Sequence, residues 1–343
     1  MRVAIVNDVE HDLETLRRIV ESIPGYEVAW LARDGEEAVA RFPLEVPDAV
    51  LMDLHMPGMN GVEATRRLMA LYPRPIMIVA SSVESNVSMV FEAMGHGAMD
   101  ALTIPCCHPE GQAKGEQLLL KKLETLKKLV APHKRVQDGA GQDLPKPSNP
   151  NLPYLVAIGT STGGPKALAA ILGALPPDFP AAVVVVQHVD SQFIRSLVTW
   201  LGDQSRLPVR LAPEGYAVEK SVACVAGTDR HLVMRENAVL GYEPAADDDL
   251  HRPSVDVFFR TLVRHWPNKG LAVLLTGMGR DGAAGLLALR QAGWRTLAQD
   301  QATCVVYGMP KAAVELQAVD AVLPLDRIAP ELLRWVHAQP VCT

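Results

Sequence analysis

Buried-strand patterns and helical patterns alternate along the first third of the chain. Short apolar runs typical of buried strands alternate with stretches in which apolar residues recur at helical spacing. We expect strands at 3–6, 28–31, 49–52, 76–80 and 98–102, and helices at 11–22, 35–42, 61–71, 85–95 and 113–130. Strands and helices that alternate through short loops predict a doubly wound, five-stranded parallel sheet.

A segment without apolar periodicity, 132–152, interrupts this alternation. Four prolines fall within 145–153, which indicates a semi-extended linker between two domains, 1–131 and 153–343. In the second domain we expect strands at 154–158, 181–187, 223–226, 271–276, 295–298 and 321–323. Helices are expected at 165–174, 191–201, 255–265, 281–292, 310–317 and 327–337. This domain is therefore predicted to be α/β, with a largely parallel sheet.

Composition narrows the classes of function. The chain has 343 residues, of which 48% are hydrophobic and 21% are charged, as in ordinary globular proteins. A net charge of −6 does not favour a nucleic-acid partner or an anionic membrane surface. No apolar stretch is long enough to span or insert into a bilayer, and the first residues lack a signal-peptide pattern. We therefore expect a cytoplasmic protein.

The cysteines support the same compartment. They are five in number, scattered, and without a C-x-x-C pair, so we expect reduced thiols. The run Cys106-Cys107-His108 contains metal-ligand types, but the sequence shows no second ligand cluster to accompany it. We therefore expect no metal at this run.

The stretch GTSTGGP at 159–165 lies between a predicted strand and a predicted helix. Gly159, Ser161 and Gly163 fit the G-x-S-x-G spacing of a nucleophile elbow, in which a sharp turn exposes the serine oxygen. The N-terminus of the following helix would present unpaired N–H groups at the same place. A plain glycine-rich turn also fits this stretch. A phosphate-binding loop is less consistent, because neither common glycine spacing for such loops is present.

Three polar residues follow three predicted strands of the second domain. Ser161 follows the first strand, His188 follows the second, and Asp281 follows 271–276 after a short glycine-containing loop. Each has an ordinary explanation, such as a polar strand end or a helix cap. If the strands are neighbours, however, the three side chains meet at one edge of the sheet. A histidine there could take the proton of the serine, and an aspartate could orient that histidine and stabilise its charged form. The order along the chain differs from that of the α/β-hydrolases.

Two carboxylates end predicted strands of the first domain. Asp8 ends the first strand and Asp53 ends the third. Together with a carbonyl oxygen they could hold a divalent cation such as Mg²⁺, which would neutralise charge while a phosphoryl group is transferred. Ordinary loop acids are the alternative reading.

The first domain resembles a response-regulator receiver domain. The resemblance rests on the D-x-x-M-P-x-M-N-G run at 53–61 and on the acid that ends the first strand. It implies that Asp53 is the phosphoacceptor, and that Asp8 and Asp53 bind Mg²⁺. Four positions depart from the family's pattern. Asn7 stands in place of the second acid and Ala80 in place of a hydroxyl residue. Ala101 stands in place of an aromatic residue and Ile104 in place of a lysine. Phosphorylation, or the response to it, is therefore expected to differ from the family's.

The second domain resembles the chemotaxis protein-glutamate methylesterases. The matching motifs are GTSTGG at 159–164, QH at 187–188, F-x-R-S at 193–196, HRPSVD at 251–256, TGMG-x-DG at 276–282 and GMP at 308–310. The resemblance implies Ser161 as nucleophile, His188 as general base and then acid, and Asp281 as the residue that orients His188. Backbone N–H groups of Thr162, Met278 and Gly279 are the candidates for an oxyanion hole. The role of the run 251–256 stays open.

The same resemblance implies substrate and partners. The substrate would be a methylated glutamate, or certain glutamines, of a chemoreceptor's cytoplasmic domain, and the ester chemistry would need no cofactor. The phosphodonor would be a chemotaxis-type histidine kinase, and the receiver would gate access to the cleft. Asn7-Asp8 and the segment 91–98 resemble the branch attached to Wsp-type surface-sensing pathways.

Three other functions are compatible with parts of the sequence. A regulatory protein that only docks receptors would explain the altered receiver, but not an intact serine, histidine and aspartate. A DNA-binding response regulator needs a basic helix-turn-helix after the linker, which the sequence does not show. An unrelated small-ester hydrolase would not need a receiver.

Overall fold

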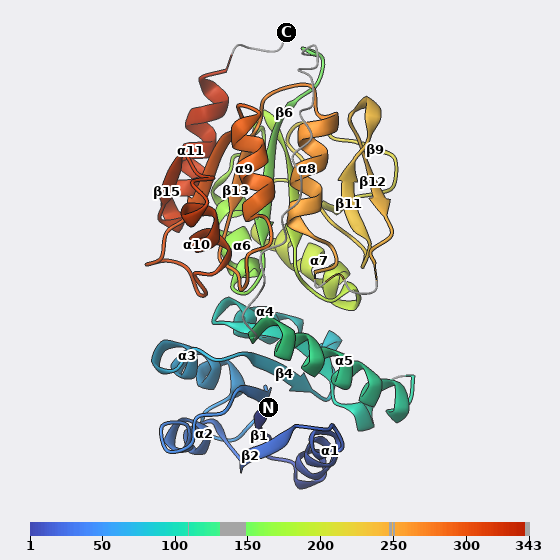
Figure 1. The fold of residues 1–343 in the computed structure, drawn as a ribbon, viewed down its shortest axis with the longest axis vertical. Helices are drawn as coiled ribbons and strands as arrows, with labels where there is room; N and C mark the ends of the chain where they lie inside the picture. Colours follow the sequence, from blue (N-terminus) through green and yellow to red (C-terminus); the bar gives the residue numbers. More distant parts are fainter. Residues whose placement is uncertain (109, 131–148, 247–248, 250, 340–343) are drawn as a thin grey trace. The chain divides into compact units, whose positions relative to one another are not determined.

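The computed structural model describes residues 1–108, 110–130, 149–246, 249 and 251–339. The chain divides into two compact units, Met1–His133 and Lys134–Thr343 (Figure 1). Within the described residues, no helix has the length and apolar character needed to cross a membrane.

The first unit contains a five-stranded parallel sheet in the order β2-β1-β3-β4-β5. Its strands are β1 (Arg2–Val6), β2 (Glu27–Ala32), β3 (Ala49–Asp53), β4 (Ile76–Ala80) and β5 (Ala98–Thr103). Its helices are α1 (Glu10–Glu21), α2 (Gly35–Arg41), α3 (Gly61–Leu71), α4 (Val87–Gly95) and α5 (Gln112–Val130), with short 3₁₀ turns η1 (Glu84–Asn86) and η2 (Pro105–Cys107). This confirms the predicted fold of the first domain.

The central strands explain why this sheet forms. Every residue of β3 and β4 is buried, which is expected for parallel strands covered on both faces. Helices α2 and α3 each begin at a side-chain cap, since Asp34 accepts from the N–H of Glu37 and Asn60 accepts from the N–H of Glu63. The capped helices place the loops, and with them the polar groups, at the carboxyl edge of the sheet.

The second unit contains a seven-stranded parallel sheet in the order β15-β14-β13-β6-β7-β10-β8. Its strands are β6 (Tyr154–Thr160), β7 (Ala181–Gln187), β8 (Val209–Leu211), β10 (Ala223–Val225), β13 (Leu271–Leu274), β14 (Arg295–Gln299) and β15 (Ala321–Leu323). The predicted parallel sheet is confirmed. Strand β6 lies between β7 and β13, so the ends of these three strands meet at one edge.

Two groups of helices pack against this sheet. Helix α6 (Gly164–Ala174) contacts α7 (Ile194–Gln204) and α11 (Leu325–His337). Helix α9 (Ala283–Gln291) contacts α8 (Val255–His265) and α10 (Met309–Glu315), and Figure 1 shows α8 and α9 side by side in orange. The remaining helical turns are η3 (Ser191–Phe193) and η4 (Glu236–Ala238).

A small antiparallel sheet was not predicted. It has the order β11-β12-β9 and consists of β9 (Tyr216–Ala217), β11 (His231–Met234) and β12 (Val239–Glu243). These strands are two to five residues long, too short for a clear alternation in the sequence. Strand β11 packs against α8 and so helps to fix that helix.

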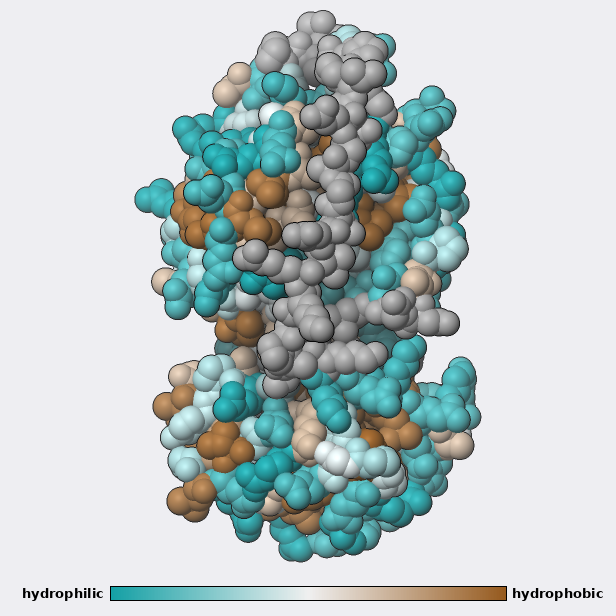
Figure 2. Space-filling model, viewed as in Figure 1, coloured by the Kyte–Doolittle hydropathy of each residue, from teal (hydrophilic) through white to brown (hydrophobic). Residues whose placement is uncertain are grey.

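Hydrophilic residues cover most of the face drawn in Figure 2, and hydrophobic residues lie on it in small, separate groups. The most exposed large hydrophobic side chains come from several parts of the chain: Val9, Leu44, Val46, Leu71, Val314, Leu316 and Val322. Such a distribution is ordinary for a folded protein surface.

Candidate active site

The glycine-rich turn at 159–165 forms a tight bend between β6 and α6. Gly163 has a φ of +82°, a conformation that favours glycine, and α6 begins at the next residue. A Cβ at Gly159 would lie 2.3 Å from Val255 Cγ1, so the close approach of α8 also requires a glycine. The turn therefore has the strand–turn–helix geometry of a nucleophile elbow.

Neighbouring segments fix the backbone of Ser161. Its N–H donates to the carbonyl oxygen of Thr276 at 3.0 Å, on the loop after β13. Its carbonyl oxygen accepts from Gln187 Nε2 at 2.9 Å and from the N–H of Gly164 at 2.8 Å. The half-buried Ser161 side chain is thus held at the edge where β6, β7 and β13 end.

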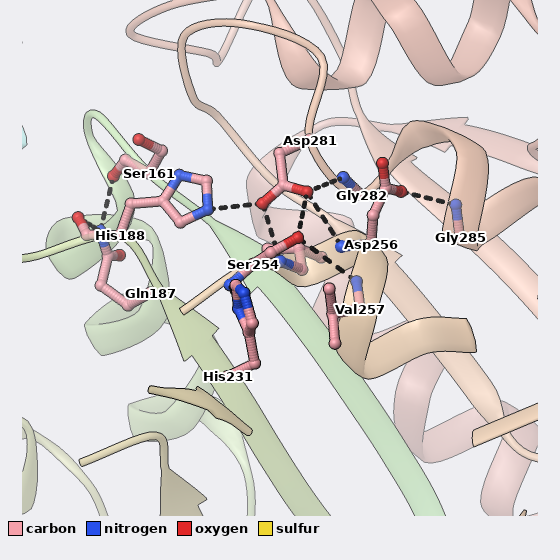
Figure 3. A network of polar contacts seen from close by, with 11 residues as sticks. Ser161, Gln187, His188, His231, Ser254, Asp256, Val257, Asp281, Gly282 and Gly285 are labelled. Atoms are coloured by element: carbon pink, nitrogen blue, oxygen red, sulfur yellow. Dashed lines mark hydrogen bonds and ion pairs between the residues drawn. The ribbon is translucent and has the colours of Figure 1, made fainter. Parts of the chain in front are cut away.

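The structure brings His188 and Asp281 together beside Ser161. His188 Nε2 lies 2.7 Å from Asp281 Oδ2, and Figure 3 shows the imidazole between Ser161 and Asp281. The other ring nitrogen, Nδ1, is buried and contacts no hydrogen-bond partner among the described residues. The tautomer that fits carries its proton on Nε2, donates it to the carboxylate, and leaves the Nδ1 lone pair on the serine side.

Asp281 accepts an unusual number of hydrogen bonds. Ser254 Oγ donates to its Oδ1 at 2.8 Å and the N–H of Asp256 donates at 3.0 Å (Figure 3). The N–H of Val255 donates at 2.7 Å. The N–H of Gly282 donates at 3.0 Å. These donors come from the N-terminus of α8 and from Asp281's own loop, so a helix end stabilises the buried carboxylate.

The ionisation of Asp281 follows from these contacts. Burial alone would raise the pKa of Asp281, but its hydrogen bond to His188 and the imidazole's charge outweigh burial and hold that pKa well below its ordinary value. The carboxylate therefore stays ionised and can stabilise an imidazolium on His188. By contrast, burial and the charge of Asp281 raise the pKa of Asp256 to about 7.

A second imidazole covers the first. The rings of His188 and His251 lie parallel, with centroids 4.2 Å apart and planes 4° apart. His251 also faces the loop after β13, since a Cβ at Gly279 would lie 3.7 Å from His251 Nε2. His251 is therefore part of the same site.

The three candidate oxyanion donors also lie on the loops that frame Ser161. Thr162 is the residue after the nucleophile candidate, and Met278 and Gly279 follow Gly277, where a Cβ would lie 2.8 Å from Ser161 Cβ. Among the described groups, none accepts a hydrogen bond from the backbone N–H of Thr162, Met278 or Gly279. These N–H groups are free to bind an oxyanion.

In the first unit, Asp53 ends β3 and is largely buried, whereas Asp8 follows β1 and is exposed. Burial raises the pKa of Asp53 to about 6, and the negative charge of Asp8 adds to the shift. Two carboxylates that repel each other in this way are suited to bind a divalent cation. The last glycine of the 53–61 run is required, because a Cβ at Gly61 would lie 1.9 Å from the Asp53 carbonyl oxygen.

Two family models match the chain: the CheB methylesterase model over residues 156–332 and the response regulator receiver domain model over residues 3–113. The chain belongs to the CheB methylesterase family. Among curated relatives, a protein-glutamate methylesterase/protein-glutamine glutaminase of Mesorhizobium japonicum is 47% identical over 337 residues, covering 97% of this chain and 98% of its own. A protein of the same name, numbered 2, from Cupriavidus metallidurans is 48% identical over 338 residues, with the same shares covered.

A solved structure agrees with these matches. The CheB methylesterase catalytic domain of Thermotoga maritima superposes with a TM-score of 0.51 and 36% identity, covering 53% of this chain and 98% of that one. The predicted family is thereby confirmed, and the two parallel sheets confirm the predicted α/β architecture of both domains.

This CheB-family chain departs from the receiver pattern in its core. Ala80, Ala101 and Ile104 are all buried, and Ile104 packs in the cluster that joins the sheet to α1 and α5. Ser81, the neighbouring hydroxyl, is exposed. Asn7 is fully buried, and its Nδ2 contacts no hydrogen-bond partner in the described part of the chain. No cationic side chain occupies the position at which a receiver carries its lysine.

Sequence reasoning missed the groups that surround the histidine and aspartate of this CheB-family site. These are His251, Ser254 and the N–H groups of Val255 and Asp256. Their run, 251–256, was recognised as a motif without a role. A capping serine directly before a helical pattern was the available signal, because the N-terminus of a helix binds anions.

Proposed function

We propose that this chain is a protein-glutamate methylesterase that also deamidates glutamine side chains, and that Ser161, His188 and Asp281 carry out the reaction. The single observation that carries the proposal is the placement of the His188 ring between Ser161 and the Asp281 carboxylate, at 2.7 Å from the latter. The names of the relatives support the substrate class.

The proposed reaction has two steps. His188 Nδ1 accepts the Ser161 hydroxyl proton while the oxygen attacks the ester carbonyl. The imidazolium then protonates the methoxide oxygen as its bond to the carbonyl carbon breaks, and methanol leaves. Water activated by the same nitrogen hydrolyses the glutamyl-serine ester and releases the carboxylate. An amide passes through the same acyl intermediate with ammonia as leaving group. The N–H groups of Thr162, Met278 and Gly279 would hold the oxyanion. Losing one such donor typically costs roughly 3–4 kcal/mol of transition-state stabilisation.

We propose the cytoplasmic domain of a methylated chemoreceptor as the substrate, which places the enzyme in the cytoplasm. Neither nucleic acid nor membrane insertion has a part in this function, and the ester chemistry uses no cofactor. The test uses membranes whose receptors carry labelled methyl esters. The full chain is expected to release labelled methanol, and to release ammonia from receptors with glutamine at the same sites. Absence of both products contradicts the proposal.

The domain assignment that goes with this function is a receiver at 1–131, a linker at 132–152 and a catalytic domain at 153–343. In it, Asp53 accepts a phosphoryl group from a chemotaxis-type histidine kinase, and Asp8 and Asp53 hold Mg²⁺. When bound there, Mg²⁺ offsets the negative charge that gathers at Asp53. Phosphorylation then shifts the population toward an arrangement in which the catalytic cleft is accessible.

The altered receiver favours one second candidate, a docking module whose Asp53 is not phosphorylated. Ile104 in place of the lysine and Ala80 in place of the hydroxyl are the observations behind it. Acetyl phosphate with Mg²⁺ separates the two. Labelling of the full chain that disappears in Asp53→Asn, together with a faster esterase, supports gating. No labelling and no change in rate support docking. The output, motility or a Wsp-type surface response, depends on the receptor served.

A further inference from the structure

Three different metal-ligand types meet outside both sites described above. His11 and Asp12 lie in the first turn of α1, and Cys106 lies in η2, directly after β5. One ligand atom from each of the three lies within 4.8 Å of the other two. The cluster therefore joins the two helical segments where they pack against each other.

The fold brings further metal-ligand side chains to the Cys106-Cys107-His108 run, which has none beside it in the sequence. No ligand residues accompany that run locally, yet Cys106 Sγ lies 3.2 Å from Asp12 Oδ1, on a residue 94 positions away. A second thiol is adjacent, since Cys107 Sγ lies 3.7 Å from Cys106 Sγ and is exposed. Three ligand side chains from two distant parts of the sequence thus gather at one place, and a fourth, Cys107, adjoins one of them.

The distances suit a small tetrahedral ion. Zinc binds sulfur at about 2.3 Å and nitrogen or oxygen at about 2.0–2.2 Å, so its ligand atoms lie about 3.5 Å apart. The thiol–carboxylate and thiol–thiol separations already have this size. His11 is exposed at the start of the helix, and one of its ring nitrogens already lies within 4.8 Å of the other two ligand atoms.

The donor set selects the metal. Mg²⁺ and Ca²⁺ prefer oxygen ligands alone, such as the pair proposed at Asp8 and Asp53. Thiolate with imidazole favours Zn²⁺ among the metals that do not change oxidation state. We propose that His11, Asp12 and Cys106 bind one zinc ion, with the Cys107 thiol as the fourth ligand. The bound ion would tie the start of α1 to the segment that follows β5.

Binding must release protons. Only the thiolate form of a cysteine binds a metal ion, and an ordinary thiol keeps its proton at neutral pH. Coordination replaces the S–H bond with an S–Zn bond and transfers the proton to the buffer, so each thiol that binds releases one proton without any redox step.

The test uses the full chain, stripped of metal with a chelator and titrated with Zn²⁺ in competition with a chromophoric chelator. We expect one Zn²⁺ per chain, with affinity at least tenfold weaker in Cys106→Ser and in His11→Ala. Cys106→Ser keeps a hydroxyl that can donate to Asp12, so folding should be retained, and a thermal melt checks this. His108→Ala and Cys304→Ser, which remove a neighbouring imidazole and a distant thiol, should bind as the parent does.

Two further readouts distinguish this site from other cation sites. Co²⁺ in place of Zn²⁺ should give thiolate-to-cobalt absorption that is weaker in Cys106→Ser, and the binding heat should depend on the ionisation enthalpy of the buffer because protons are released. Less than one Zn²⁺ per chain, equal affinity in Cys106→Ser, or loss of binding only in Asp53→Asn would overturn the proposal. Esterase activity does not enter the test, so its outcome is independent of the proposed function.

Discussion

The imidazole rings of His188 and His251 lie parallel, with centroids 4.2 Å apart. His188 must keep one ring plane to donate to Asp281 from Nε2 while its Nδ1 faces Ser161. The flat face of His251 limits rotation of that ring. Stacking on His251 therefore helps to hold the imidazole of His188, the proposed base, in its orientation.

Replacing His251 tests this support. We expect His251→Ala to lower kcat roughly 10- to 100-fold, because small misplacements of a catalytic group have effects of this size. His251→Phe keeps a flat ring and should retain most of the rate. Both variants are assayed for methanol release from methylated receptor membranes. An unimpaired His251→Ala, or a His251→Phe as slow as His251→Ala, contradicts a supporting role for the stack.

Ser254 links the stability of α8 to catalysis. Its Oγ donates to Asp281 at 2.8 Å and accepts from the N–H of Val257 at 3.3 Å as the N-cap. Ser254→Ala should lower the free energy of unfolding by about 1 kcal/mol and also lower kcat. Ser254→Thr retains a hydroxyl and should restore both. Urea denaturation and methanol release measure the two effects. A Ser254→Ala variant that loses stability but keeps kcat would show that the contact with Asp281 is only structural.

Asp256 should make stability depend on pH. Its pKa is raised to about 7 in the folded chain, whereas an unfolded aspartate titrates near 4. The folded state therefore binds more protons between these values, and the free energy of unfolding falls as pH rises from about 4 through about 7. Asp256→Asn removes this contribution and can still accept from the N–H of Gly285.

The comparison is made by urea denaturation of the full chain at about pH 5 and about pH 8. The advantage of Asp256→Asn over the parent should grow with pH and level off above about pH 7. Asp326→Asn, which changes an exposed carboxylate in α11, serves as control. A pH-independent difference for Asp256→Asn would contradict the shifted pKa.

Asp281→Asn should disable the base without removing it. A neutral amide cannot stabilise the imidazolium, and it no longer fixes the proton on His188 Nε2. By analogy with other triads we expect kcat to fall about 10⁴-fold. Steady-state methanol release measures the loss. A loss of tenfold or less would indicate that His188 does not depend on this carboxylate.

The meeting of Ser161, His188 and Asp281 could be predicted from the sequence because each follows a recognisable strand, Asp281 after a short loop, and parallel strands end at the same edge. The partners of Asp281 could not be predicted, since they depend on how the N-terminus of α8 packs across the end of β6. Which nitrogen of His188 faces the carboxylate is likewise a result of packing. The small antiparallel sheet was missed because strands of two to five residues carry too little periodicity.

The same reasoning applies to the first unit. The five strands and the positions of Asp8 and Asp53 were predictable from buried runs and the residues that end them. The meeting of His11 and Asp12 with Cys106 was not, because it joins segments more than ninety residues apart through the contact of α1 with η2.

The central claim is that Ser161 is the nucleophile, and methanol release by full-chain Ser161→Ala tests it most directly. The substitution removes one oxygen from a half-buried side chain, so the melting curve should match that of the parent. Ser205→Ala, which changes a serine at the C-cap of α7, is the control and should release methanol at the parent rate. We predict that Ser161→Ala releases no methanol above the background of the membranes alone. Release at the parent rate by a correctly folded Ser161→Ala would contradict the assignment of the active site.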